Sequence, residues 1–215
     1  DAAPSVSNVL ITDTTISSTL YVKDGDSVSV TATITDGNLN AGDTSYLKAN
    51  LTGFGLGAAV NATAYNGTVA WWNFTVDSCN PSDGTVTVTI NASDPAGNYN
   101  NTESDTITAD NTPPTFNYAV FSPDYNGNNY SYIDVYFSEN IDNSTVATAD
   151  FTISISGVTV TTVYTGANTN KVTLRLSHKI TGGGPTITIS GNGVDDLAGN
   201  TMSSGTVTIN TYRIT

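Results

Sequence analysis

The chain has 215 residues, and nineteen Asp and Glu against six Lys and Arg give it a formal charge of −13. This charge excludes nucleic acid and anionic lipid as partners, because both are bound through clustered Lys and Arg. The length suits two domains of about 100 residues each, and since no apolar run reaches the ~18 residues of a membrane span, we predict no membrane contact within this segment.

Apolar and polar residues alternate with a period of two along the chain, for example over 28–35, and this pattern predicts half-buried β-strands. One helical turn is predicted over 143–150, capped by Asn143 or Ser144. Short strands separated by Gly, Asn and Asp indicate β-sandwiches. The expected strands lie near 5–11, 16–22, 27–35, 45–52, 59–65, 68–76, 84–92 and 102–109, and then near 116–121, 130–137, 151–155, 158–164, 170–177, 185–190 and 204–210.

A five-residue motif occurs twice. Residues 94–98 (DPAGN) recur as 196–200 (DLAGN), and a Thr-Ile pair follows each copy at the same distance. We interpret the motif as a hairpin turn, in which Asp accepts hydrogen bonds from turn amides and Gly takes a positive φ. The repeat predicts two tandem modules, 1–110 and 111–215.

Strand parity sorts the aromatic residues into inner and outer faces. Trp72 is expected in the core and Trp71 on the outer face, largely exposed. In the second module Tyr132 and Tyr136 are expected to point outward. We predict Trp71, Tyr132 and Tyr136 as ligand-binding candidates for a sugar ring or a partner protein. The alternative is that outward aromatics form cross-strand pairs that shield the backbone.

Several segments carry a family resemblance. In the second module 120–123, 133–139, 150–151 and 195–200 resemble the bacterial and archaeal Ig-like domains of S-layer and large adhesin proteins. The first module, in segments such as 94–110, is similar to the other common prokaryotic Ig-like type. The resemblance implies an all-β fold of two tandem immunoglobulin-like β-sandwiches. It also implies an extracellular, cell-surface and non-catalytic spacer or lattice element, which we expect to be archaeal.

Two other classes of function stay open beside the spacer. One is a filament or sheath subunit that adds a strand to the open edge of a neighbouring copy. The other is a module that binds a glycan or a receptor, so the expected partners are neighbouring copies, other cell-surface proteins and glycans. An enzyme is not expected. The lone histidine, His178, could act as a base, but the sequence contains no Gly-x-Ser-x-Gly motif to supply a nucleophilic serine. The lone cysteine, Cys79, has no Lys, Arg or His near it in sequence that would lower the pKa of its thiol.

Calcium is the cofactor that the sequence predicts. Ca²⁺ prefers six to eight oxygen ligands, and carboxylates at the joint between the modules can supply them. The joint 110–113 resembles that of cadherin repeats, although Ile107 replaces the acidic residue upstream. The alternative is a Pro-stiffened linker with solvated carboxylates. The predicted metal ligands are Asp110, Glu139, Asp195, Asp196, Asp24 and Asp26, with Asp142 and Asp83 as further candidates.

Asn-x-Ser/Thr sequons predict glycosylation if the source organism glycosylates its surface proteins. Asn73 and Asn91 fall on outward positions of predicted strands. The eight sequons are at Asn50, Asn61, Asn66, Asn73, Asn91, Asn100, Asn129 and Asn143. The opening segment 1–4 is similar to the joint 110–113, so we expect the chain to be part of a longer series of modules.

Overall fold

A computed structural model describes residues 2–122, 132–167, 169–180 and 187–209. The chain divides into two compact units, Asp1–Asn111 and Thr112–Thr215. We refer to them as the first and second modules and describe each by itself. In the described part of the chain, no helix is long and apolar enough to span a membrane.

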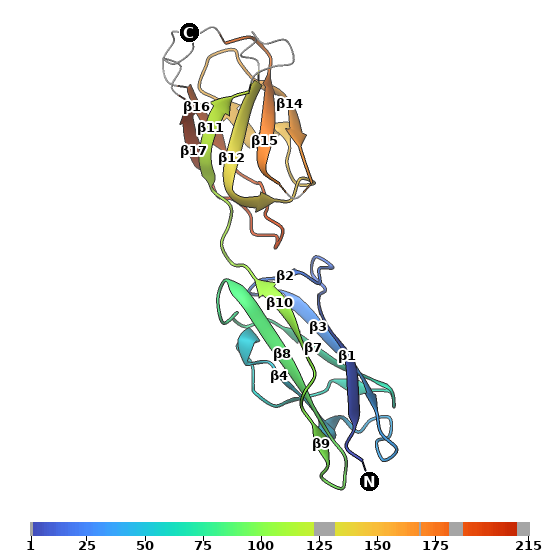
Figure 1. Cartoon of the computed structure of the whole chain (residues 1–215). Helices are drawn as coiled ribbons and strands as arrows, with labels where there is room; N and C mark the ends of the chain where they lie inside the picture. Colours follow the sequence, from blue (N-terminus) through green and yellow to red (C-terminus); the bar gives the residue numbers. More distant parts are fainter. Residues whose placement is uncertain (1, 123–131, 168, 181–186, 210–215) are drawn as a thin grey trace. The chain divides into compact units, whose positions relative to one another are not determined.

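The first module is a sandwich of two sheets (Figure 1). Neighbouring strands pair antiparallel, except that β2 and β10 run parallel. One sheet has the order β1 (Ser5–Asp13), β3 (Ser27–Thr35), β7 (Val69–Thr75) and β6 (Ala64–Tyr65). The other has the order β2 (Tyr21–Val22), β10 (Ser104–Ala109), β8 (Gly84–Ser93), β4 (Leu47–Asn50) and β5 (Val60–Asn61), with β9 (Tyr99–Asn100) paired to β8. The short 3-10 helices η1 (Thr44–Tyr46) and η2 (Thr52–Phe54) flank β4.

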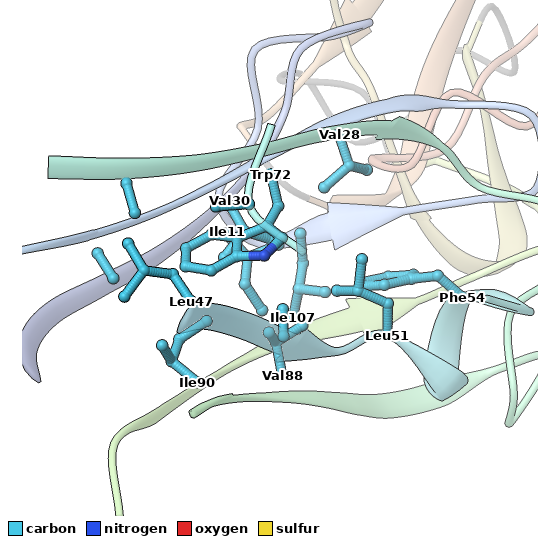
Figure 2. Close-up of a cluster of buried hydrophobic side chains, with 14 of the residues drawn as sticks. Ile11, Val28, Val30, Leu47, Leu51, Phe54, Trp72, Val88, Ile90 and Ile107 are labelled. Atoms are coloured by element: carbon cyan, nitrogen blue, oxygen red, sulfur yellow. The ribbon is translucent and has the colours of Figure 1, made fainter. Parts of the chain in front are cut away.

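Trp72 occupies the centre of the first module's core. Figure 2 shows its indole reaching from β7 toward Leu47, Val88 and Ile90 of the facing sheet. The side chain is 1 % exposed, and its Nε1 donates a hydrogen bond of 3.0 Å to the Val60 carbonyl. The predicted burial of Trp72 is therefore confirmed, and the indole N–H is satisfied inside an apolar environment.

The second module has two antiparallel sheets that enclose a separate core around Ile133, Phe137 and Leu174. The larger sheet has the order β11 (Phe116–Phe121), β12 (Tyr132–Ile141), β15 (Thr169–Leu176) and β14 (Val160–Thr165). The smaller has the order β13 (Phe151–Ile153), β16 (Ile187–Gly191) and β17 (Gly205–Ile209). The all-β sandwich fold predicted from the alternation is confirmed in both modules.

Several local predictions differ from the structure. The strand expected at 59–65 is divided into β5 and β6, which belong to different sheets. The strand expected at 16–22 shrinks to Tyr21–Val22, because Asp13 and Ser18 exchange backbone hydrogen bonds of 2.7 and 3.0 Å around a tight turn. The helical turn is a 3-10 helix, η3 (Thr148–Asp150), without the predicted cap: Ser144 bonds to Asp142 instead, through its amide and hydroxyl. Trp71 is partly buried rather than largely exposed. Positions 130–131, 185–186 and 210 of the expected strands lie outside the described residues.

We predict that Trp72→Ala destabilises the first module by about 3–5 kcal/mol, because it removes an indole from a close-packed core. Trp71→Ala, on the outer face of the same strand, should cost about 1 kcal/mol or less. Denaturant unfolding of both variants measures the difference. Equal losses at the two positions would show that the outer ring contributes to stability as much as the core ring does.

Candidate functional site

The repeated motif forms the same turn in both modules. The Oδ1 atom of Asp94 accepts the Asn98 amide at 2.9 Å and its Oδ2 accepts the Asn98 side chain at 2.9 Å. Asp196 makes the same two bonds to Asn200, at 2.8 and 2.9 Å. The glycines have φ of +91° and +79°. The hydrogen bonds from Asn98 lower the pKa of Asp94, so this carboxylate acts structurally as an anion that closes a turn.

The predicted metal ligands of the first module have structural partners. Asp26 is buried; its carboxylate accepts the Lys23 amide at 2.8 Å and pairs with the Lys23 ammonium at 3.3 Å. Asp24 is exposed and accepts the Cys79 amide at 2.7 Å. Asp83 accepts the Asn111 amide at 2.7 Å. These carboxylates hold the turns at one end of the module.

In the second module, Glu139 and Asp196 lie together, and a carboxylate oxygen of one is within 4.8 Å of an oxygen of the other. Glu139 belongs to β12, which runs past the predicted end of the strand to Ile141. The neighbouring Asp195 has a buried Oδ1 atom with no hydrogen-bond partner in the described part of the chain. Asp142, whose Oδ1 accepts the amide and hydroxyl of Ser144, bonds through its amide to the Asp195 carbonyl at 2.8 Å.

Asp110 directly follows β10, and its amide donates to the Val22 carbonyl at 3.0 Å. It is partly buried. This backbone bond continues the parallel pairing of β2 and β10, so Asp110 starts from a fixed position at the end of the first module's last strand.

A buried carboxylate that the sequence analysis did not single out lies at the end of β1. Asp13 is 0 % exposed; its Oδ1 accepts the Thr15 amide at 2.7 Å, while its Oδ2 has no partner among the described residues. Burial, with a smaller contribution from the negative charge of Asp26, raises the pKa of Asp13. Its inward position two residues after Ile11 was the available signal, because the bulge between Ser7 and Leu10 breaks the alternation with the first half of β1.

The outward aromatics of the larger sheet in the second module form ring pairs. Tyr136 stacks on Tyr118 with centroids 4.4 Å apart and planes at 15°. Tyr132 and Tyr164 are 6.3 Å apart and tilted at 43°. Both predicted tyrosines are thus on the outer face, and each has a tyrosine neighbour that the sequence analysis did not name.

Trp71 forms no such ring pair within the described ranges of the chain. Its register neighbours on the outer face of the first module are Thr31 and Ala64.

The described sequon asparagines lie at the surface, and the predicted outward positions of Asn73 and Asn91 are confirmed by their exposure. Asn100 is the exception in being partly buried, and its side-chain amide donates to the Pro4 carbonyl at 3.2 Å. Asn129 lies outside the described residues. The exposed sequon asparagines are Asn50, Asn61, Asn66, Asn73, Asn91 and Asn143.

The two potential nucleophile systems differ in environment. Cys79 is buried, and burial together with the neighbouring Asp24 raises the pKa of its thiol to about 12, so it is protonated at neutral pH. His178 is exposed, with Nδ1 3.0 Å from the Ser177 hydroxyl. That hydroxyl oxygen also accepts the Thr159 amide at 3.0 Å, so it joins two strand ends.

A shallow cavity of about 510 Å³ lies on the second module beside β13, β16 and β17, and it is lined by small polar residues and Asp150. The Asp150 carboxylate accepts the Ala147 amide at 2.6 Å, which secures the start of η3.

Comparison with known proteins supports the same fold. Residues 110–213 match the sequence model of the bacterial Ig-like domain. Domains of this family are typical of extracellular and surface proteins, and the fold is generally non-catalytic. No curated protein matches the chain.

Among the solved structures that align with the chain, three illustrate the low sequence identity. The fibronectin(III)-like modules of Clostridium thermocellum CbhA are 9 % identical with a TM-score of 0.31, covering 96 % of this chain and 97 % of that one. The human desmocollin-1 ectodomain is 12 % identical with a TM-score of 0.35, covering 88 % of this chain and 33 % of that one. Bovine butyrophilin is 6 % identical with a TM-score of 0.28, covering 95 % and 99 %.

We predict that Asp13→Asn stabilises the first module at pH 7. A raised folded-state pKa means that Asp13 contributes its full stability below the unfolded value near 3.8, and that this contribution is lost as pH rises through the folded pKa. The gain should therefore vanish near pH 3. Thermal unfolding of the wild type and the variant at both pH values measures the difference in stability. Asp77→Asn is the control, because it removes one negative charge at an exposed position. An equal gain at both pH values would show that ionisation of Asp13 is not the cause.

Proposed function

We propose that the chain is a non-catalytic spacer or lattice element of an extracellular cell-surface protein, of the S-layer, sheath or adhesin-stalk type. The supporting observation is the repeated Asp-x-Ala-Gly-Asn turn, which forms with the same hydrogen bonds in two modules that each enclose their own core. A unit that is closed and repeated serves length and spacing. The match of residues 110–213 to the bacterial Ig-like domain supports the surface location.

Such a spacer has to resist extension. Antiparallel ladders run the length of both modules, so pulling at the ends has to break many backbone hydrogen bonds together. The joint contains Pro113 and Pro114, whose rings fix φ and reduce the freedom of the linker.

Single-molecule pulling of the chain from its two ends tests the spacer function. We expect two separate unfolding events, each releasing roughly 35 nm, because a module of about 100 residues extends by about 3.5 Å per residue. Trp72→Ala should lower the force of one event and leave the other unchanged. Extension without force peaks, or one event that releases the whole chain, would contradict a string of independent modules.

We propose, in addition, that Ca²⁺ binds at the joint through Asp110, Glu139, Asp195 and Asp196. Three features support this: the proximity of the Glu139 and Asp196 carboxylates, the unpartnered Oδ1 of Asp195, and the place of Asp110 just before the linker. Neighbouring anions repel each other, and a divalent cation with oxygen ligands relieves that repulsion. The turn already uses both oxygens of Asp196, so the buried Oδ1 of Asp195 is the ligand atom that would gain most from the ion.

Calcium should stabilise the folded state and so raise the melting temperature of the chain. At a free calcium concentration a hundred times the dissociation constant, the free energy of unfolding should increase by about 2.7 kcal/mol. Asp110→Asn and Glu139→Gln should each remove most of this effect, whereas Asp77→Asn should leave it intact. Calorimetric titration with calcium chloride measures the binding directly. No heat of binding at millimolar calcium would rule out the site.

A second candidate function is adhesion. The tyrosine pairs on the outer face of the second module favour it, because aromatic side chains there can contact a glycan or a receptor.

The third possibility is assembly with neighbouring copies through the edge strands of the second module. These are β11 and β14 in the larger sheet and β13 and β17 in the smaller one. Concentration-dependent sedimentation separates assembly from adhesion to an added ligand.

Glycosylation would add to a surface role. We propose the exposed sequons as acceptors, with Asn50 as the best placed. Its Oδ1 accepts the amide and the hydroxyl of Thr52 at 3.2 and 2.7 Å, so the sequon is already folded into a turn at an exposed position. Asn100 is the least suited, because its amide nitrogen bonds to Pro4. Mass spectrometry of peptides from the native protein tests this order; modification at Asn100 alone would contradict it.

A further inference from the structure

The outer face of the larger sheet in the second module combines aromatic rings with cations. Parity and register place its residues in cross-strand rows. Tyr118, Tyr136 and Lys171 form one row, and Tyr132 pairs with Arg175 in another. Between them, Asp134 pairs with Thr173, which pairs in turn with Tyr164. We call this surface the tyrosine face; its residues for the present argument are Tyr118, Tyr132, Tyr136, Tyr164, Lys171 and Arg175.

The rings of the tyrosine face stay accessible. Tyr118 and Tyr164 are 46 % and 47 % exposed. Tyr132 and Tyr164 come from β12 and β14, which are separated by β15, so their rings meet over that strand at 6.3 Å. Arg175 belongs to β15 and is the register partner of Tyr132. Pairing between rings therefore covers the strands without closing the face to a ligand.

The charges on this face are unevenly balanced. Asp134 is 8 % exposed, and it accepts the Lys171 ammonium at 3.3 Å and the Thr173 hydroxyl at 2.6 Å. Lys171 is thereby neutralised. Arg175 is exposed, and within the described residues its guanidinium has no ion pair or hydrogen bond. An uncompensated cation beside two tyrosines is unusual in a chain with nineteen acidic and six basic residues.

We propose that the tyrosine face binds an anionic polysaccharide, so that Arg175 pairs with a sugar carboxylate while Tyr132 and Tyr164 contact the sugar rings. A guanidinium binds a carboxylate through two parallel hydrogen bonds. A tyrosine ring offers an apolar surface for sugar C–H groups and a hydroxyl for sugar hydroxyls. The open face of a sheet also suits a polymer that runs across several strands. This inference rests on the adhesion role proposed above and names its ligand class.

Charge complementarity supports a ligand that is extended and anionic. The acidic surface as a whole repels a polyanion, whereas on the tyrosine face the exposed Arg175 lies beside the tyrosine rings and favours contact. We therefore expect modest affinity, binding confined to this face, and weakening by salt. A neutral glycan would leave the guanidinium unused.

The probe is polygalacturonate, with its methyl ester as the matched polymer without charge. Binding is measured by calorimetry in the presence of a chelator, so that calcium cannot bridge two acidic polymers. We expect polygalacturonate to bind and its methyl ester to bind much more weakly. Arg175→Gln should lower the affinity on the order of tenfold, the usual loss for a charge-assisted hydrogen bond. Tyr164→Ala should lower it as well.

Lys48→Gln is the control, because it removes one exposed cation from β4 of the first module and should leave the affinity unchanged. Melting temperatures confirm that each variant is folded. Equal binding of the charged and esterified polymers, or of wild type and Arg175→Gln, overturns the anionic ligand but not adhesion. Self-association that Arg175→Gln abolishes, without binding of either polymer, would assign the face to a second copy. The pulling experiment is independent of all these outcomes.

Discussion

Alternation of side chains along each strand is the constraint on which both modules depend. In β3, Val28, Val30, Ala32 and Ile34 are buried, and the Ser and Thr residues between them face outward. The inner set meets Trp72 and the facing sheet, and a change there disturbs the whole core. The outer set is free of that requirement, so the surface chemistry of a sandwich can vary while its fold is kept.

Acidic residues meet a second requirement, that of the turns. Asp26, Asp94 and Asp196 are buried at turns, where they accept backbone amide hydrogen bonds. Such a bond satisfies an amide that the turn leaves without a partner, and it stabilises the charged form of the carboxylate. The formal charge of −13 therefore overstates the carboxylates available to a ligand. The calcium proposal accordingly depends on the proximity of Glu139 and Asp196 and on the buried, unpartnered Oδ1 of Asp195 rather than on the number of acidic residues.

The sequence predicted the elements of the fold better than their contacts. Period-two alternation identified the strands around Trp72 and the inward side chains of β12, because parity is a local property. The Asp-x-Ala-Gly-Asn turn was also predictable, since its bonds join residues four apart. The short β2 was not, because the reversal at Asp13 and Ser18 competes with strand propensity.

The candidate sites show the same division. Parity placed Tyr132 and Tyr136 on the outer face, but their neighbours Tyr164 and Tyr118 are set by register between strands distant in sequence. The predicted exposure of Trp71 was wrong in degree, since parity specifies a face without specifying what covers it. The burial of Asp13 follows from parity in β1, yet its missing hydrogen bond depends on the packing of the whole module end.

The two sandwiches differ where the constraint is weakest. The outer face of β3 carries Ser29, Thr31 and Thr33, whereas that of β12 carries two tyrosines and a buried Asp134. Hydroxyl side chains are sufficient to keep an outer face soluble, as those of β3 do in the first module. Asp134 instead requires Lys171 and Thr173 to offset its desolvation, and the tyrosines expose apolar area. The tyrosine pairs can stabilise the strands beneath them, but the exposed Arg175 beside Tyr132 fills no core and pairs with no acid among the described residues, which is the feature that the proposed recognition role accounts for.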